Sequence, residues 1–131
     1  MDSNKLDALL AQWEETYKKG LLTFWLLLLL SQRKAYPYEI KNAILALSQN
    51  SISADENSIY RALNRMALTG LVGSELQSSE TGPSRRYFYL TEPGRTLLNR
   101  FISRNILIFQ NPAVAGAIKK VLATNNIMKG K

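Results

Sequence analysis

The sequence predicts a mainly α-helical fold with a small β-hairpin, a winged helix-turn-helix that has extra helices at both ends. Apolar residues recur at the spacing of an amphipathic helix along most of the 131 residues, but between residues 72 and 90 the spacing changes to the alternation of a strand. A short helical segment and a loop also precede a helix with a polar outer face, as in a helix-turn-helix. We expect a single winged-helix domain over residues 1–131, with its core at about 21–92.

The first helix is expected at residues 4–19, with Ser3 or Asn4 as its cap. Large apolar side chains follow one face of it at helical spacing: Leu6, Leu9, Leu10, Trp13 and Tyr17. A minimal domain of this size has no obvious use for such a stripe, so we expect it to bind a second subunit.

The apolar run from Leu21 to Leu30 predicts a second helix, at 21–32, that is buried on nearly all sides. The run is ten residues long, whereas a helix that spans a membrane needs about 20. Acids precede it and no small-residue cleavage site follows, which argues against a signal peptide. We therefore expect a cytoplasmic protein with no membrane contact.

The third helix is expected at 38–48, and a loop at 49–54. Pro37 suits the first turn of a helix, because the N–H that it lacks would be unpaired there in any case. The apolar side chains of this helix should lie in the core: Ile40, Ile44, Leu45 and Leu47.

The helix from Ala54 to Leu71 is the one around which the fold is organised. Asp55, Asn57 and Ser58 are good N-cap types, and Gly70 is the residue expected just past the end. At about 100° per residue, one face should pack into the core: Ile59, Ala62, Leu63 and Met66. The opposite face carries a different set: Asn57, Arg61, Asn64 and Leu68, with Tyr60 and Arg65 at its edges.

This outer face lacks the mixture of lysine and glutamate that the solvent face of a soluble helix usually has. Positions 57–68 contain no acid, and their polar groups are Asn, Ser, Tyr and Arg. Such side chains can reach phosphates and base edges in the major groove of DNA. The pattern indicates a recognition helix, and an ordinary surface helix stays open as the alternative.

A β-hairpin should follow, with strands at about 72–78 and 85–90 and a turn-rich segment between them. Both faces of the second strand carry apolar groups, so the sequence does not show which face points inward. A hairpin directly after a helix-turn-helix is a wing, and this one can lay Arg85 and Arg86 along a phosphate backbone or into a minor groove.

The C-terminal part is expected to form two helices. Thr91 caps the first, which starts at about 94, runs to about 110 and has more apolar surface than one core face requires. Pro112 breaks it, and Ala113 to Ala123 form the second, followed by a loose polar tail from Thr124 to Lys131. We expect the helices at 94–123, together with 4–19, to form a homodimer.

The net charge of +7 lies in the C-terminal third: residues 1–92 carry ten acids and ten bases, and residues 93–131 carry seven bases and no acid. Its sign suits a polyanion partner. The absence of cysteine and histidine excludes zinc fingers, thiol catalysis and histidine-based triads. Without a phosphate-loop motif or paired carboxylates, we expect no enzyme, no cofactor and no metal.

Three segments together resemble the PadR family of transcriptional regulators. An apolar helix leads to Tyr-Pro-Tyr-Glu-Ile at 36–40; residues 58–66 read Ser-Ile-Tyr-Arg-Ala-Leu-Asn-Arg-Met, with Gly-Leu at 70–71; and a basic-aromatic strand ends in Leu-Thr-Glu-Pro-Gly at 90–94. The match runs from Leu21 to Phe109. It departs from the family pattern at four positions: Tyr36, Pro37, Arg61 and Leu68.

The resemblance implies a winged-helix regulator that binds double-stranded DNA in a sequence-specific way, as a homodimer on a near-palindromic operator. We expect a repressor, and an activator stays open as the alternative. The residues implied in DNA binding come from the recognition helix (Ser58, Tyr60, Arg61, Asn64, Arg65), the wing (Arg85, Arg86) and the third helix (Tyr38, Lys41). The alternatives are that Tyr38 packs between helices, that Tyr60 belongs half to the core, and that Arg65 is a solvated charge.

Two further readings stay open. A winged-helix module that binds another protein and no DNA is the alternative function, and the exposed apolar residue expected at Leu68 is a small hint of it. The family also suggests a small-molecule effector between two subunits, in a pocket lined by large aromatic residues: Trp13, Trp25, Phe101 and Phe109. Packing of the core and dimer interface is the favoured reading of these residues, because apolar stripes at helical spacing usually pack.

Overall fold

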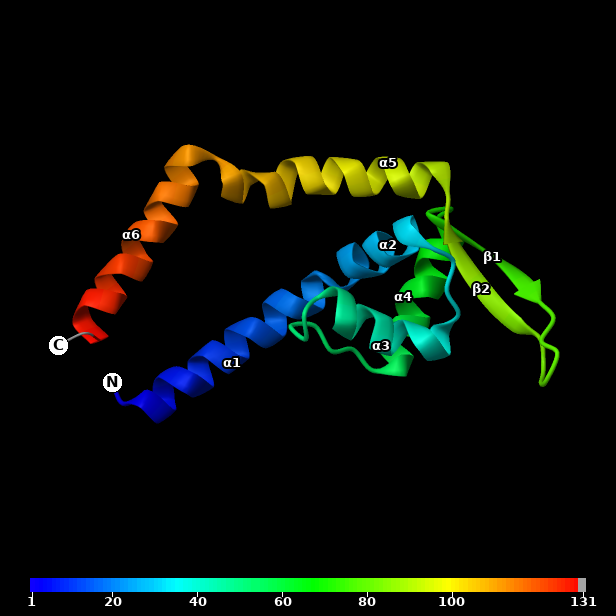
Figure 1. Cartoon of the computed structure of the whole chain (residues 1–131), viewed down its shortest axis with the longest axis horizontal. Helices are drawn as coiled ribbons and strands as arrows, with labels where there is room; N and C mark the ends of the chain where they lie inside the picture. Colours follow the sequence, from blue (N-terminus) through cyan, green and yellow to red (C-terminus); the bar gives the residue numbers. More distant parts are fainter. Residues whose placement is uncertain (130–131) are drawn as a thin grey trace. The chain divides into compact units, whose positions relative to one another are not determined.

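The computed structural model describes residues 1–129 and the side chains of residues 1–124. By its internal contacts the chain divides into two compact units, residues 1–96 and the residues from Leu97 onward. Helices predominate, and the described strands form one antiparallel pair (Figure 1). That the whole chain forms one domain stays a prediction.

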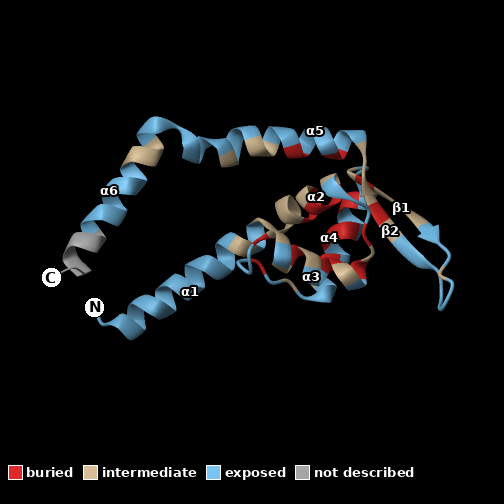
Figure 2. Cartoon of the chain, in the orientation of Figure 1, coloured by how far each residue is buried: buried red, intermediate tan, exposed pale blue. Residues whose placement is uncertain are grey.

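The helix α1 (Ser3–Gly20) is exposed along its length and buries none of its residues (Figure 2). Its cap is Asp2 and not the predicted Ser3 or Asn4, because the chain is still extended at Asp2, whose Oδ1 accepts a hydrogen bond from the Lys5 N–H at 2.8 Å. The predicted apolar stripe is uncovered in the monomer: Leu6, Leu9, Leu10, Trp13 and Tyr17 are all exposed.

The helices α2 (Leu22–Gln32) and α3 (Pro37–Leu47) form much of the core of the first unit. Burial of α2 is complete only in its second half, at Leu26, Leu27, Leu29 and Leu30, and its first turn is half-buried. In α3 the predicted core positions Ile40 and Ile44 are buried. The prediction was wrong for Leu45 and Leu47, which are half-buried at the edge of the packed face.

The helix α4 (Glu56–Leu68) has the predicted core face: Ile59, Ala62, Leu63 and Met66 are all buried. It is shorter than the expected 54–71 because hydrogen bonds end it at both sides. Asp55 Oδ1 accepts from the Ser58 N–H at 2.7 Å, and Gly70 turns the chain at a φ of 83° so that the Leu71 N–H reaches the Met66 carbonyl at 2.9 Å.

The wing consists of β1 (Val72–Gln77) and β2 (Arg85–Leu90), paired so that Val72 lies opposite Leu90 and Gln77 opposite Arg85. Phe88 is buried, so its face of β2 is the inner one. The segment 33–37, expected to be only a connection, contributes an isolated bridge in which Ala35 and Phe88 exchange both backbone hydrogen bonds, at 3.1 and 2.8 Å. This bridge fastens the wing to the start of α3.

The helix α5 (Glu92–Phe101) begins where the wing ends. As predicted, Thr91 caps it: its Oγ1 accepts from the Gly94 N–H at 3.1 Å and donates to the Gly70 carbonyl at 2.6 Å. Gly94 is buried, and a Cβ there would collide with the Leu71 carbonyl oxygen, so this position requires glycine.

The expected single helix to about 110 changes its winding after α5, to a π-helix at Ile102–Ile106 and a 3₁₀ turn at Leu107–Gln110. The helix α6 (Pro112–Lys129) follows and includes most of the segment that we expected to be a loose tail, because no glycine or proline interrupts it after Gly116; residues 130–131 lie outside the described residues. No single described helix is long and apolar enough to cross a membrane, and only the pair Glu92–Gln110 and Pro112–Thr124, bent by 52°, meets the length and composition together.

Candidate nucleic-acid interface

A groove of about 650 Å³ lies between α4, the start of α3 and β2. We call it the wing groove. Five of the nine predicted site residues line it: Tyr38, Tyr60, Asn64, Arg85 and Arg86. Its described lining holds two bases and no acid, since the remaining members are Tyr36, Pro37, Ser84 and Phe88.

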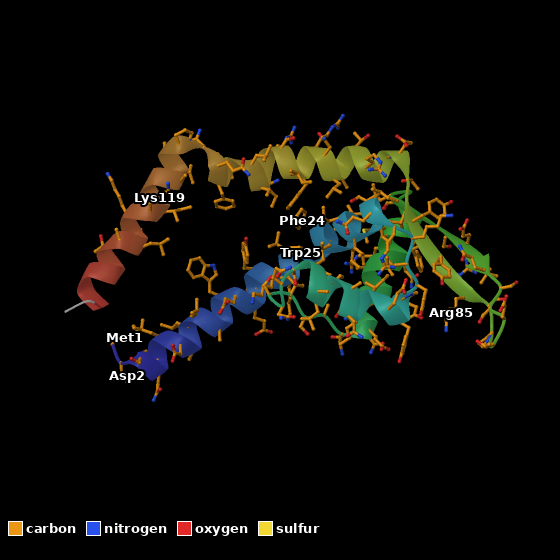
Figure 3. All side chains as sticks on the ribbon, viewed as in Figure 1. Met1, Asp2, Phe24, Trp25, Arg85 and Lys119 are labelled. Atoms are coloured by element: carbon orange, nitrogen blue, oxygen red, sulfur yellow. The ribbon has the colours of Figure 1, made fainter. Side chains whose placement is uncertain are left out.

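The two wing arginines are oriented by neighbours that leave their charge unpaired. The Arg85 guanidinium carbon lies 4.6 Å from the centre of the Tyr36 ring, and this ring packs edge-on against Tyr87 (Figure 3 labels Arg85). Arg86 donates a hydrogen bond from Nη1 to Ser74 Oγ at 2.9 Å. Within the part of the chain that the structure describes, neither guanidinium pairs with a carboxylate. Both are therefore available to an anion.

The two predicted site tyrosines of the wing groove are exposed. Tyr38 is 76% exposed, so it does not pack between helices in this structure. Tyr60 is 47% exposed, so about half of the residue is covered and half faces the groove, and its half-core reading stays open. Their hydroxyl groups can donate hydrogen bonds to phosphate oxygens.

Three other predicted residues, Ser58, Arg61 and Arg65, lie on the opposite flank of α4. They line a groove of about 510 Å³ between α4, residues 52–55 and the last turn of α1, which we call the α1 groove. Lys18 and Lys19 of α1 belong to the same lining, together with Glu15 and Asp55. Lys41 is exposed on α3 and lines neither groove.

A chain of hydrogen bonds links the start of α4 to this second flank. The Ser58 hydroxyl donates to Asp55 Oδ2 at 3.2 Å and accepts from Arg61 Nη2 at 3.3 Å. The backbone N–H of Ser58 lowers the pKa of Asp55, and the Ser58 hydroxyl and the Arg61 charge add to this. Because its proton is donated to Asp55, the Ser58 hydroxyl must break this bond before it can donate to a phosphate.

On the wing, Lys34 holds β1 from the connection before α3. Its Nζ lies 2.6 Å from Glu75 Oε1, which also accepts from Gln77 Nε2 at 3.0 Å. These hydrogen bonds, that of Lys34 first, lower the pKa of Glu75. The pair fixes the wing at a second place besides the Ala35–Phe88 bridge. Among the described residues, no cluster of three or more metal-binding side chains occurs.

Comparison with models of known protein families identifies the family of this chain. The model of the transcriptional regulator PadR-like family matches residues 26–100. The chain belongs to this family. The resemblance read from the three segments is therefore confirmed, as is the winged-helix fold class, and the family consists of transcriptional regulators and not of enzymes.

Solved structures of similar proteins agree. The PadR-like chain is 27% identical to a PadR-like transcriptional regulator from Bacillus cereus, over 86% of this chain and 96% of that one, with a TM-score of 0.57. A PadR family regulator from Eggerthella lenta is 22% identical, over 92% of this chain and 97% of that one, with a TM-score of 0.63. Bacillus subtilis PadR in complex with operator DNA is 21% identical, over 65% of this chain and 48% of that one, with a TM-score of 0.60. No curated protein matches the chain.

Sequence reasoning missed part of the lining of both grooves in this PadR-like protein. Lys18 and Lys19 are not among the predicted site residues, because bases in the last turn of a helix such as α1 are favourable there without any partner. Tyr36 was read only as a departure from the family pattern, although it holds Arg85 in the wing groove. The nearest signal for Tyr36 was its place directly before Pro37, in the segment that the family pattern marks.

Proposed function

We propose that this PadR-like protein binds a specific double-stranded DNA operator as a homodimer and represses transcription. The wing groove is the observation that carries the proposal, because it brings two unpaired arginines, two exposed tyrosines and Asn64 to one flank of α4. In the proposed complex α4 lies in the major groove, with Arg61 and Asn64 toward base edges and the wing arginines on phosphates.

The relative from Bacillus subtilis supports the DNA partner, since its structure contains operator DNA and its fold matches this chain. Repression is the mode that we propose, because occupying an operator is enough to block transcription and needs no contact with another protein. The cytoplasmic location belongs to the same proposal, as the place where such a protein meets DNA.

The exposed stripe of α1 supports the homodimer. Trp13 is 72% exposed, and the neighbouring members of the stripe are exposed as well, so the monomer leaves a continuous apolar face uncovered. A second copy related by a two-fold axis would cover it and would present two copies of α4 about one turn of DNA apart. Such a dimer requires a near-palindromic operator.

A small-molecule effector between the subunits is a further part of the proposal. Trp25 supports it, because its indole N–H is buried and has no hydrogen-bond partner in the described part of the chain. An acceptor on a ligand or on the partner subunit would satisfy this donor.

Selection of bound duplexes from random sequence tests the function. The proposal expects enrichment of a near-palindrome with half-sites about 10 base pairs apart. Leu68 favours the alternative, a protein-binding module, because it is 88% exposed on the outer face of α4. If the protein elutes from heparin only at raised salt and the selection enriches one DNA motif, operator binding is supported. If heparin does not retain the protein and the selection enriches no motif, the protein-binding module is favoured.

A further inference from the structure

We infer that the α1 groove is a second binding site for the DNA backbone, in which Lys18 and Lys19 contact the strand opposite to the one held by the wing. The inference rests on the proposed function. It adds Lys18 and Lys19, which lie outside the winged core, to the DNA-binding surface. It also specifies which DNA strand these two lysines contact.

The α1 groove gathers four bases from two parts of the chain that are far apart in sequence. Lys18 and Lys19 come from the last turn of α1, and Arg61 and Arg65 from α4. The lysine side chains are 39% and 77% exposed. The groove is thus accessible, and its positive charge adjoins the outer face of the recognition helix.

The acids near this groove neutralise its positive charge only weakly. Lys18 pairs with Glu14 at 3.5 Å and Lys19 with Glu15 at 3.1 Å, both within one turn of α1 and both exposed to water. Such pairs contribute little and exchange readily for a phosphate. Asp55 is already engaged as the cap of α4 through Ser58.

The geometry of α4 determines which DNA strand the groove faces. Tyr60 and Asn64 line the wing groove, whereas Arg61 and Arg65 line the α1 groove, so the two grooves lie on opposite flanks of the same helix. A major groove is about 12 Å wide and has a phosphate backbone on each side. A helix that lies in it therefore meets one strand on each flank, and the α1 groove meets the strand that the wing does not.

The test compares two double variants. The first combines Lys18→Gln and Lys19→Gln, and the control combines Lys119→Gln and Lys120→Gln. The control removes two adjacent exposed lysines from α6 and lowers the net charge equally. Affinity for the selected operator is measured by fluorescence anisotropy over a range of salt. In the proposed dimer the double variant loses two phosphate contacts per subunit, four in all. This should lower the log–log salt slope by about 3.6, so that wild type loses about 150-fold more affinity than the variant between 50 and 200 mM salt.

Glu15→Gln provides a change in the opposite direction. It frees Lys19 and removes a negative charge from the groove, so operator affinity should rise while helicity and sedimentation stay as in wild type. A helix-stabilising role of the two lysines alone predicts the reverse, because Glu15→Gln removes an ion pair from α1. Unchanged or lowered affinity in this variant overturns the inference.

Ethylation of individual phosphates locates the contacts. Ethylation of a contacted phosphate weakens binding of wild type, but it has no effect on a variant that lacks the contact. The phosphates whose ethylation no longer affects the Lys18/Lys19 double variant should lie on one strand. Those whose ethylation no longer affects the double variant Arg85→Ala with Arg86→Ala should lie on the opposite strand. The inference is wrong if the control variant flattens the salt slope equally, if the double variant keeps the wild-type slope, or if both sets of phosphates share one strand. Failure of wild type to bind any DNA refutes the proposed function itself, which is a separate outcome.

Discussion

Replacing Arg61 and Asn64 separately by alanine should weaken sequence preference while leaving the fold intact. Both side chains are exposed on α4, opposite the buried face that contains Ile59 and Leu63. The hydrogen bond from Arg61 to Ser58 Oγ is long, at 3.3 Å, and exposed. We therefore expect each variant to unfold within about 0.5 kcal/mol of wild type, the usual range for surface changes.

The loss of specificity can be estimated from the chemistry of these side chains. Arginine can contact guanine, and asparagine adenine, through two hydrogen bonds, and each such contact is worth about 1–3 kcal/mol of discrimination. In a two-fold dimer each contact occurs twice, so one substitution should reduce the ratio of operator to random-DNA affinity by about 2–6 kcal/mol, or roughly 30-fold to 10⁴-fold. Affinity for random DNA should change little, because the wing arginines remain.

The assay is binding of wild type and each variant to the selected operator and to scrambled DNA at one fixed salt concentration. Arg95→Ala and Asn99→Ala are matched controls, since both residues are exposed on α5 and lie outside the two grooves. Tyr60→Phe removes only a hydroxyl and reports on a single hydrogen bond. If wild type prefers no sequence, or if both alanine variants discriminate as well as wild type, α4 is not the reading helix and the protein-binding alternative gains.

Three further outcomes are expected. The double variant Arg85→Ala with Arg86→Ala should weaken operator and random DNA by similar factors. It should also lower the salt slope by up to about 3.6, for four lost phosphate contacts in the dimer, as binding curves at several salts will show. Loss of operator binding alone, at an unchanged slope, would mean that these arginines read bases. Trp13→Glu should turn a sedimenting dimer into a monomer while the control Gln12→Glu does not, and a monomeric wild type contradicts this. Asp55→Asn keeps a capping oxygen but removes the carboxylate with its lowered pKa. The stability that this carboxylate contributes is present above the ordinary pKa of Asp and is lost as the pH falls through the lowered pKa. The melting temperature of wild type should therefore fall more than that of the variant between about pH 5 and pH 2, and equal falls would exclude a stabilising role for the ionised Asp55 carboxylate.

The features predictable from the sequence were those fixed by local pattern. The buried face of α4 follows from its period, and the strands were placed to within a residue because alternation and turn-forming residues bound them. Helix ends were less predictable, because hydrogen bonds of single residues decide them. Asp2 and not Ser3 caps α1, and Asp55 starts α4 later than its helical pattern alone suggests.

The division of the candidate site into two grooves is tertiary, and no local pattern contains it. The period of α4 separates Tyr60 and Asn64 from Arg65, but it does not show what faces each flank. The Ala35–Phe88 bridge sets one neighbour, because it fastens β2, and with it the wing arginines, beside the start of α3. A bridge made by one residue has no alternation that a sequence pattern could reveal. The other neighbour is the last turn of α1, whose two lysines already satisfy the local preference for positive charge at the C-terminal end of a helix. A residue that already satisfies one local rule gives no sign of a second role, so a contact surface built from such residues becomes visible only when the fold brings them together.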